Sequence, residues 1–108
     1  MFIIADAKRG DIGNTAALYA KAFFEKMDFD AVTLAPYMGR DAITPFLQYE
    51  GKWVIILALT SNPSAEDFET KVLADGRPLF REVVENMNGI VPDSHQRVMY
   101  VIGATRAE

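Results

Sequence analysis

Cysteine is absent from this chain, and histidine occurs once, as His95. The lack of cysteine excludes disulfides, thiolate nucleophiles and cysteine-ligated metals. A single histidine, placed in a stretch of Pro, Asp and Ser, argues against a zinc site built on imidazoles. No run approaches the roughly 18 consecutive apolar residues of a membrane span, and no signal peptide precedes the first apolar run. We therefore expect a cytoplasmic protein with no membrane partner.

Basic residues are also fewer than acidic ones. The 108 residues contain 11 Lys and Arg against 15 Asp and Glu, which gives a net charge of −4. No cluster of Lys and Arg stands out, so nucleic acid is not an expected partner. Half of the residues are apolar, which suits a buried core rather than a disordered chain. Residues 1–108 are expected to form one domain segment.

Apolar runs and helical patterns alternate along the chain. The apolar runs predict strands at residues 2–7, 30–35, 53–59 and 98–102. Helix signals lie at residues 14–27, 39–49 and 78–88, and Pro78 suits the first turn of the last of these. Asn14 or Thr15 can cap the first helix. The apolar side of that helix is expected to consist of Leu18, Tyr19, Ala22, Phe23 and Met27.

This alternation predicts an α/β fold with about four parallel strands joined by right-handed crossover helices. The run at 53–59 is apolar without alternation, which is typical of strands covered on both faces. The glycines never form the G-x-G-x-x-G of doubly wound nucleotide-binding folds. A complete (β/α)8 TIM barrel typically needs about 250 residues. We therefore interpret the chain as a partial (β/α)8 barrel rather than an open sheet.

One decapeptide, residues 6–15, concentrates charge at the end of the first expected strand. It reads DAKRGDIGNT. Because side chains alternate along a strand, Ile4, Asp6 and Lys8 should share one face, and Ile3, Ala5 and Ala7 the other. Parallel α/β proteins carry their chemistry at the carboxyl ends of strands. An Asp–Lys pair there is a candidate active site, although it can equally be an ordinary, weak surface ion pair.

The decapeptide resembles the D-x-K-x-x-D-I-x-x-T signature of the orotidine 5′-phosphate decarboxylase family. Asp6, Lys8, Asp11, Ile12 and Thr15 occupy its defined positions. Residues 30–33 with 36–41, then 57–62, then 101–105 are similar to later strand ends of that family, most of all in its longer bacterial branch. The resemblance covers essentially the whole chain, which would correspond to strands three to six of the eight-stranded barrel.

The resemblance implies cofactor-free decarboxylation of orotidylate to uridylate in pyrimidine biosynthesis, with no metal or organic cofactor. Loss of CO₂ leaves a carbanion on the pyrimidine ring, so the site must place a cation there and then deliver a proton. Lys8 is suited to both tasks, and Asp6 would orient it beside the substrate carboxylate.

The family pattern also assigns binding residues. Asp11, as a third catalytic residue, and Thr15 would reach into the site of a neighbouring subunit, which implies a homodimer with shared sites. Ile12 and Thr15 are expected to contact orotidine 5′-phosphate, and Ser61 to hydrogen-bond the pyrimidine edge. From the residues alone, Ser61 can instead be a turn residue, since Asn62 and Pro63 follow it.

Two other interpretations stay open. Magnesium-dependent sugar-phosphate decarboxylases and hexulose-phosphate synthases share D-x-K-x-x-D, and Asp11-Ile12-Gly13 fits their D-x-G. The chain can also be a non-catalytic half-barrel fragment. The family site needs an acid and a lysine from the first two strands and phosphate ligands from the last two, so we expect the isolated chain to be inactive. Arg40 is interpreted as a solvated surface residue, and the role of Arg106 is left open.

Overall fold

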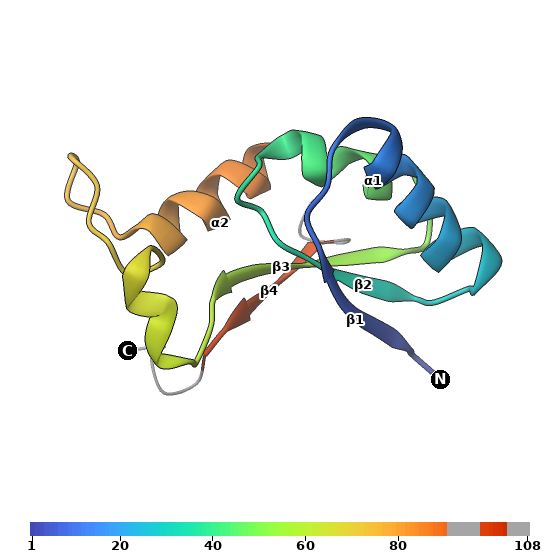
Figure 1. Cartoon of the computed structure of the whole chain (residues 1–108), viewed down its shortest axis with the longest axis horizontal. Coiled ribbons are helices and arrows are strands. Elements are labelled where there is room, and N and C mark those ends of the chain that lie inside the picture. The colour runs from blue at the N-terminus through green and yellow to red at the C-terminus, as the bar shows by residue number, and fades with distance from the viewer. Residues whose placement is uncertain (91–97, 104–108) are drawn as a thin grey trace.

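The structure, a computed structural model, describes residues 1–90 and 98–103. Its centre is a four-stranded sheet in the order β1-β2-β3-β4, with every neighbouring pair parallel (Figure 1). The strands are β1 (Ile4–Arg9), β2 (Ala31–Leu34), β3 (Trp53–Leu59) and β4 (Val98–Ile102). The expected α/β class is confirmed, and the boundaries of β3 and β4 are those that the apolar runs predict.

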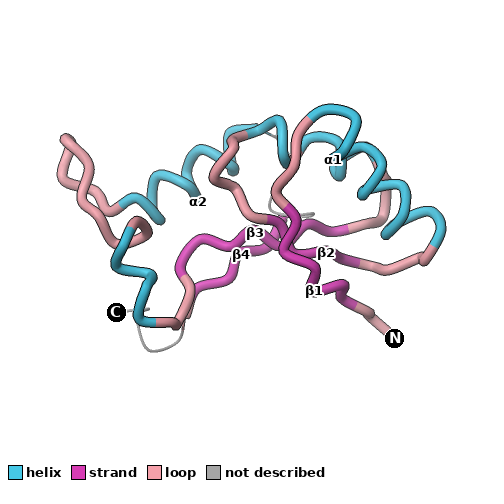
Figure 2. The backbone as a smooth tube through the Cα atoms, in the orientation of Figure 1, coloured by secondary structure: helices cyan, strands magenta, loops and turns pink. Residues whose placement is uncertain are grey.

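The two α-helices of the described residues lie on one side of the sheet (Figure 1). Helix α1 (Gly13–Ala20) follows β1, and α2 (Leu79–Ile90) joins β3 to β4. Both lie over the same face of the sheet, as the backbone tube also shows (Figure 2). A doubly wound sheet would carry helices on both faces, whereas sequential parallel strands with helices on one face form part of a (β/α)8 barrel. The fold is therefore the partial barrel that the sequence predicts.

The register of the strands assigns their faces. Ala5, Val32, Val54 and Val98 stand opposite one another across the four strands, and all belong to the core between sheet and helices. The β3 residues Val54, Ile55, Ile56, Ala58 and Leu59 are each at most 8% exposed. The absence of alternation in the sequence of this strand is thus matched by burial on both of its faces.

Aromatic side chains join the helical layer together above the sheet. Phe46 is 1% exposed and lies edge-on to Phe24, with their ring centroids 6.0 Å apart. The ring centroid of Tyr49 lies 5.6 Å from that of Phe24, with the two ring planes tilted by 58°. Edge-to-face pairs of this kind add to the free energy gained from buried area. Phe46 therefore connects the segment after β2 to the helix after β1.

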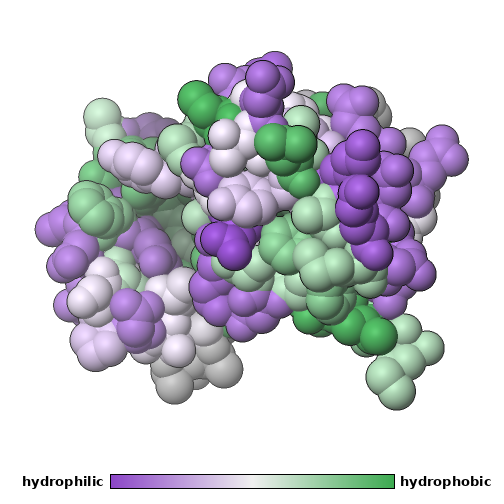
Figure 3. Space-filling model, turned by 45° about the vertical axis from the view of Figure 1, so that its right-hand side comes forward, coloured by the Kyte–Doolittle hydropathy of each residue, from purple (hydrophilic) through white to green (hydrophobic). Residues whose placement is uncertain are grey.

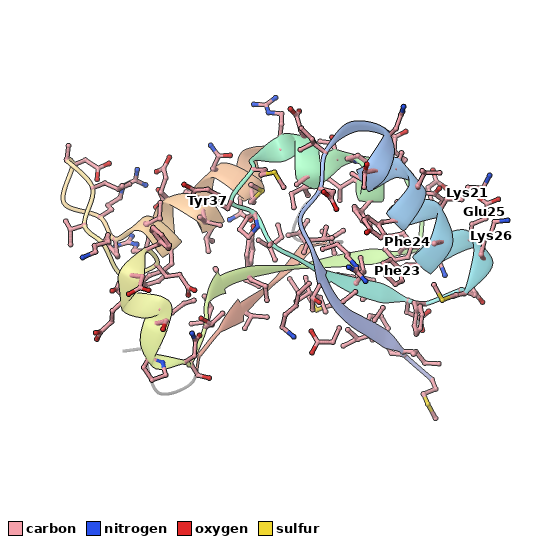
Figure 4. The ribbon with its side chains drawn as sticks, viewed as in Figure 1. Lys21, Phe23, Phe24, Glu25, Lys26 and Tyr37 are labelled. Atoms are coloured by element: carbon pink, nitrogen blue, oxygen red, sulfur yellow. The ribbon has the colours of Figure 1, made fainter. Side chains whose placement is uncertain are left out.

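The buried side of the first helix consists of different residues from those that the sequence predicts. Its last part, η1 (Lys21–Lys26), is π-helical, and Met27 N–H accordingly donates to the Ala22 carbonyl. The buried residues are Ala16, Ala20 and Phe24, whereas Leu18 is 67% and Met27 53% exposed. Small alanines let the helix approach the sheet closely, and the wider π turn changes which side chains face inward. Figure 4 shows Phe23 and Phe24 directed toward the sheet and Lys21, Glu25 and Lys26 directed away.

The prediction of one helix over residues 39–49 is wrong. The segment forms two short 3₁₀ helices, η2 (Arg40–Ala42) and η3 (Thr44–Gln48). Pro45 lies at the start of η3, where its missing N–H and its ring prevent a continuous α-helix from Gly39. Asp41 lies in the first turn of η2, and Arg40 is exposed on the surface, as expected.

Two further elements shape the ends of the molecule. A 3₁₀ helix that the sequence did not predict, η4 (Pro63–Asp67), begins the connection from β3 to α2. Ahead of β1, Phe2 and Ile3 are 52% and 46% exposed, and Ile4 in the strand is 47% exposed, so Ile3 is not buried with Ala5. Within the described residues, none of the helices is long and apolar enough to cross a membrane.

Candidate active site

The charged pair of the decapeptide lies inside an irregular part of β1. The expected strand 2–7 is shifted, because pairing starts at Ile4 and continues to Arg9. Ala5 pairs with Val32 and Arg9 with Leu34, so β1 takes four steps where β2 takes two. Such a bulge is uncommon between parallel strands and redirects the side chains within it. Lys8, in the bulge, has a positive φ of 51°, a conformation that costs a lysine about 1–2 kcal/mol.

Asp6 and Lys8 come together as predicted. The Lys8 ammonium donates to Asp6 Oδ1 at 2.7 Å. The Lys8 side chain is 55% exposed and the Asp6 side chain 64%. Both lie on the face of the sheet opposite Ala5 and the helices. An exposed ion pair of this kind contributes little to stability. Its open position leaves both groups accessible to a ligand.

Thr33 of β2 completes this cluster. Its hydroxyl donates to Asp6 Oδ1 at 3.0 Å and accepts the backbone N–H of Lys8 at 2.9 Å. Thr33 is 6% exposed, and it is the one buried polar side chain within the described residues. Sequence reasoning missed this role. The available signal was a hydroxyl in the middle of an otherwise apolar strand, residues 31–34.

The pKa of the Asp6 carboxyl is lowered from its ordinary value. The first cause is the hydrogen bond from Lys8, followed by the hydrogen bond from Thr33, and the positive charge of Lys8 acts in the same direction. Because folding lowers this pKa, the ionised pair stabilises the fold above the ordinary aspartate pKa of about 4. That contribution is lost as the pH falls through the lower pKa of the folded state.

The rest of the decapeptide leads away from the pair. Ile12 is the N-cap residue of α1, which begins at Gly13, so Asn14 and Thr15 do not cap the helix as expected. Asp11, Ile12 and Thr15 are exposed. Within the described parts of the chain, Asp11 forms no ion pair with the Asp6–Lys8 cluster. The structure therefore presents these three residues to solvent rather than to the cluster.

Ser61 lies just beyond the end of β3, at the same edge of the sheet as the end of β1. It is exposed, and its backbone packs closely on Gly103, where an added Cβ would meet Ser61 N and Cα at 3.2 Å. The neighbouring Thr60 is held by Glu69, which accepts hydrogen bonds from Thr60 N–H and Oγ1. The structure gives Ser61 a defined backbone position but no contact with Lys8.

A cavity of about 340 Å³ opens at this edge, between the strand ends and α2. Its walls are mainly apolar and include Leu57, Phe68, Leu79 and Phe80. Figure 3 shows the surface hollowed on its left side, with hydrophobic atoms inside the hollow. Asp6 and Lys8 do not line it, and no pattern in the sequence predicts it. The cavity and the charged cluster are thus separate features of the sheet.

Candidate metal ligands are dispersed over the described surface. Across residues 1–90 and 98–103, no three His, Asp or Glu side chains gather in a way that could hold a metal ion. His95 and Arg106, considered from the sequence, lie outside the described residues.

Comparison with known proteins identifies relatives along almost the whole chain. The model of the "Orotidine 5′-phosphate decarboxylase / HUMPS family" matches residues 1–97. A Bacteroides fragilis protein named orotidine 5′-phosphate decarboxylase is 58% identical over 105 residues, which are 97% of this chain and 38% of the relative. A Flavobacterium johnsoniae protein of the same name is 55% identical over 108 residues, which are 100% of this chain and 38% of the relative.

Solved structures agree with these matches. The OMP decarboxylase of Leishmania donovani superposes with a TM-score of 0.86 at 40% identity, over 94% of this chain and 40% of that one. The putative enzyme of Toxoplasma gondii superposes with a TM-score of 0.88 at 35% identity, over 95% of this chain and 42% of that one. The chain spans about 38% of the length of the curated relatives named above. On these matches, the chain belongs to the orotidine 5′-phosphate decarboxylase / HUMPS family.

Proposed function

We propose that this chain supplies the central charged part of the active site of an orotidine 5′-phosphate decarboxylase. The observation that carries the proposal is the Asp6–Lys8 pair, 2.7 Å apart and exposed, near the carboxyl end of β1. The names of the relatives support the decarboxylase over the magnesium-dependent members of the family. We propose that the protein acts in the cytoplasm, as its composition led us to expect.

In the proposed reaction, the bond between the pyrimidine ring and its carboxyl group breaks. The carbon leaves as CO₂, and the electron pair of the broken bond stays on the ring. Lys8 stabilises that developing charge with its ammonium and then transfers a proton to the same ring carbon. Asp6 orients the ammonium through the 2.7 Å hydrogen bond. The step needs no electron acceptor, because the ring carbon ends with a proton in place of CO₂.

Asp11, Ile12 and Thr15 are proposed to act on a second subunit. All three are exposed, and they lie between the end of β1 and the first turns of α1. A homodimer would let Asp11 approach the partner's Lys8 and let Ile12 and Thr15 contact its substrate. We propose that Ser61, on the same edge of the sheet, hydrogen-bonds the pyrimidine.

The function is tested with a hybrid barrel, in which this chain replaces the matching segment of the Bacteroides fragilis relative. We expect the hybrid to convert orotidylate to uridylate, measured by ultraviolet absorbance, and to do so equally in the presence of EDTA. The isolated 108-residue chain should show no measurable turnover, since phosphate binding and further charged groups come from other strands. Loss of hybrid activity in EDTA would instead favour the magnesium-dependent alternative. A hybrid that folds without turnover would contradict the proposal.

The assembly is tested on the chain itself. We expect dimers or larger species in sedimentation velocity at micromolar concentration, because the exposed apolar side chains of Ile12 and Leu18 flank the proposed subunit contact. Replacing Leu18 by Lys should shift the distribution toward monomer. A monomeric wild-type chain at that concentration would argue against the dimer.

A further inference from the structure

The bulge in β1 creates a problem for the backbone. Between Ala5 and Arg9, the regular backbone hydrogen bonds from β1 to β2 are interrupted. The Lys8 N–H therefore has no carbonyl of β2 in register with it. The Lys8 N–H is part-buried, and an N–H left without a partner costs up to about 1–3 kcal/mol when it is fully buried. Lys8 also has its positive φ of 51°. Some other group must therefore hold this part of the chain in place.

The Thr33 side chain solves that problem. A hydroxyl has one proton to donate and lone pairs that accept. Thr33 Oγ1 accepts the Lys8 N–H at 2.9 Å and is placed to donate its proton to Asp6 Oδ1 at 3.0 Å. The same carboxylate oxygen receives the Lys8 ammonium at 2.7 Å. One hydroxyl thus connects the backbone of Lys8 to the carboxylate that holds its side chain.

We propose that Thr33 is a positioning residue, which fixes the bulged backbone at Lys8 and the orientation of the Asp6 carboxylate at once. This inference rests on the proposed function for its catalytic meaning, but its structural content does not. Thr33 lies on a different strand from the charged pair and is 6% exposed, so it does not itself need to meet substrate. It sets where the ammonium of Lys8 is held before substrate arrives.

A simpler role for Thr33 is to fill space, because β-branched residues suit strands. Two substitutions separate the roles. Thr33→Val keeps the shape and removes both hydrogen bonds, whereas Thr33→Ser keeps the hydroxyl and removes a methyl group. A packing role predicts that the serine variant is the more disturbed. A positioning role predicts that the valine variant is the more disturbed of the two. Thr70→Val, in the connection between η4 and α2, serves as the matched control.

The main measurement is the titration of the Asp6 carboxyl by carbon-detected NMR in the 108-residue chain. We expect Thr33→Val to raise the Asp6 pKa, since one hydrogen bond to its ionised form is lost, while Thr33→Ser and Thr70→Val leave it low. The Lys8 amide proton should exchange faster with solvent in the valine variant. An Asp6 titration that is the same in the valine and wild-type chains would overturn the proposal.

Catalysis provides the second measurement. In the hybrid barrel, Thr33→Val should lower kcat by about tenfold or more with KM within about twofold, because misplacing a catalytic group slows chemistry more than binding. Thr33→Ser should restore most of the rate. If the valine variant fails to fold, the exchange of the Thr33 hydroxyl proton with solvent is measured in the wild-type chain. Slow exchange supports the proposal, and rapid exchange contradicts it. A hybrid without activity would refute the proposed function but leave the Asp6 titration result standing.

Discussion

Replacing Lys8 by alanine is expected to reduce orotidylate decarboxylation by the hybrid barrel by at least about a thousandfold. The substitution removes both the cation that faces the developing carbanion and the proton that quenches it. Loss of one preorganised charge contact typically costs about 10²–10³ in rate, and loss of a general acid about 10²–10⁴. Steady-state turnover, followed by the absorbance change of orotidylate, measures the effect.

The structure makes this substitution easy to interpret. Alanine keeps the Cβ of Lys8, so the backbone cost of its positive φ of 51° is unchanged. The removed ion pair is exposed and contributes little to stability. Lys21→Ala, on the outer side of the helix after β1, is the control and should leave the rate unchanged (Figure 4). If Lys8→Ala keeps more than a tenth of the activity, Lys8 is not the proton donor.

Replacing Phe46 by alanine is expected to lower the free energy of unfolding by about 3–5 kcal/mol. Phe46 is 1% exposed, belongs to the core, and is the edge-on partner of Phe24. Small domains have total stabilities of about 5–15 kcal/mol, so this loss is a large share of the whole. Urea unfolding followed by circular dichroism measures it.

Phe68→Ala is the matched control for this experiment. It removes the same atoms from a side chain that is 64% exposed. Its ring contacts Tyr37 at 6.3 Å between centroids, and we expect a change below about 1 kcal/mol. Equal effects at the two positions would show that Phe46 does not hold the segment after β2 to the helix after β1 as we describe.

The sequence predicts the sheet better than the helices. β3 is a long apolar run and β4 a shorter one, and both appear where the runs place them. Hydrophobic runs suffice for buried strands because burial on two faces leaves little choice of residue. The helix predictions are wrong where a local backbone feature overrides the spacing of the apolar residues. Pro45 divides one expected helix, and the π turn after Ala20 changes which residues of the other are buried.

The charged residues of the candidate site can be predicted from the sequence, but the bulge and the Thr33 hydrogen bonds that hold them in place cannot. The spacing of Asp6 and Lys8 predicts that they meet, and they do, at 2.7 Å. It does not predict the bulge, because the two extra residues of β1 are visible only when the register with β2 is known. The role of Thr33 depends on that bulge. The meeting of Asp11, Ile12, Thr15 and Ser61 with a substrate stays a prediction.

The strand order β1-β2-β3-β4 also bears on how the chain acquires its fold. Each strand pairs with the one made just before it, so every new strand and helix can add to an edge that already exists during synthesis. Contacts between segments close in sequence form faster than distant ones, since less loop entropy is lost. We therefore expect these four strands to pair in the order in which they are made, with Asp6, Lys8 and Thr33 brought together as soon as β2 has paired with β1.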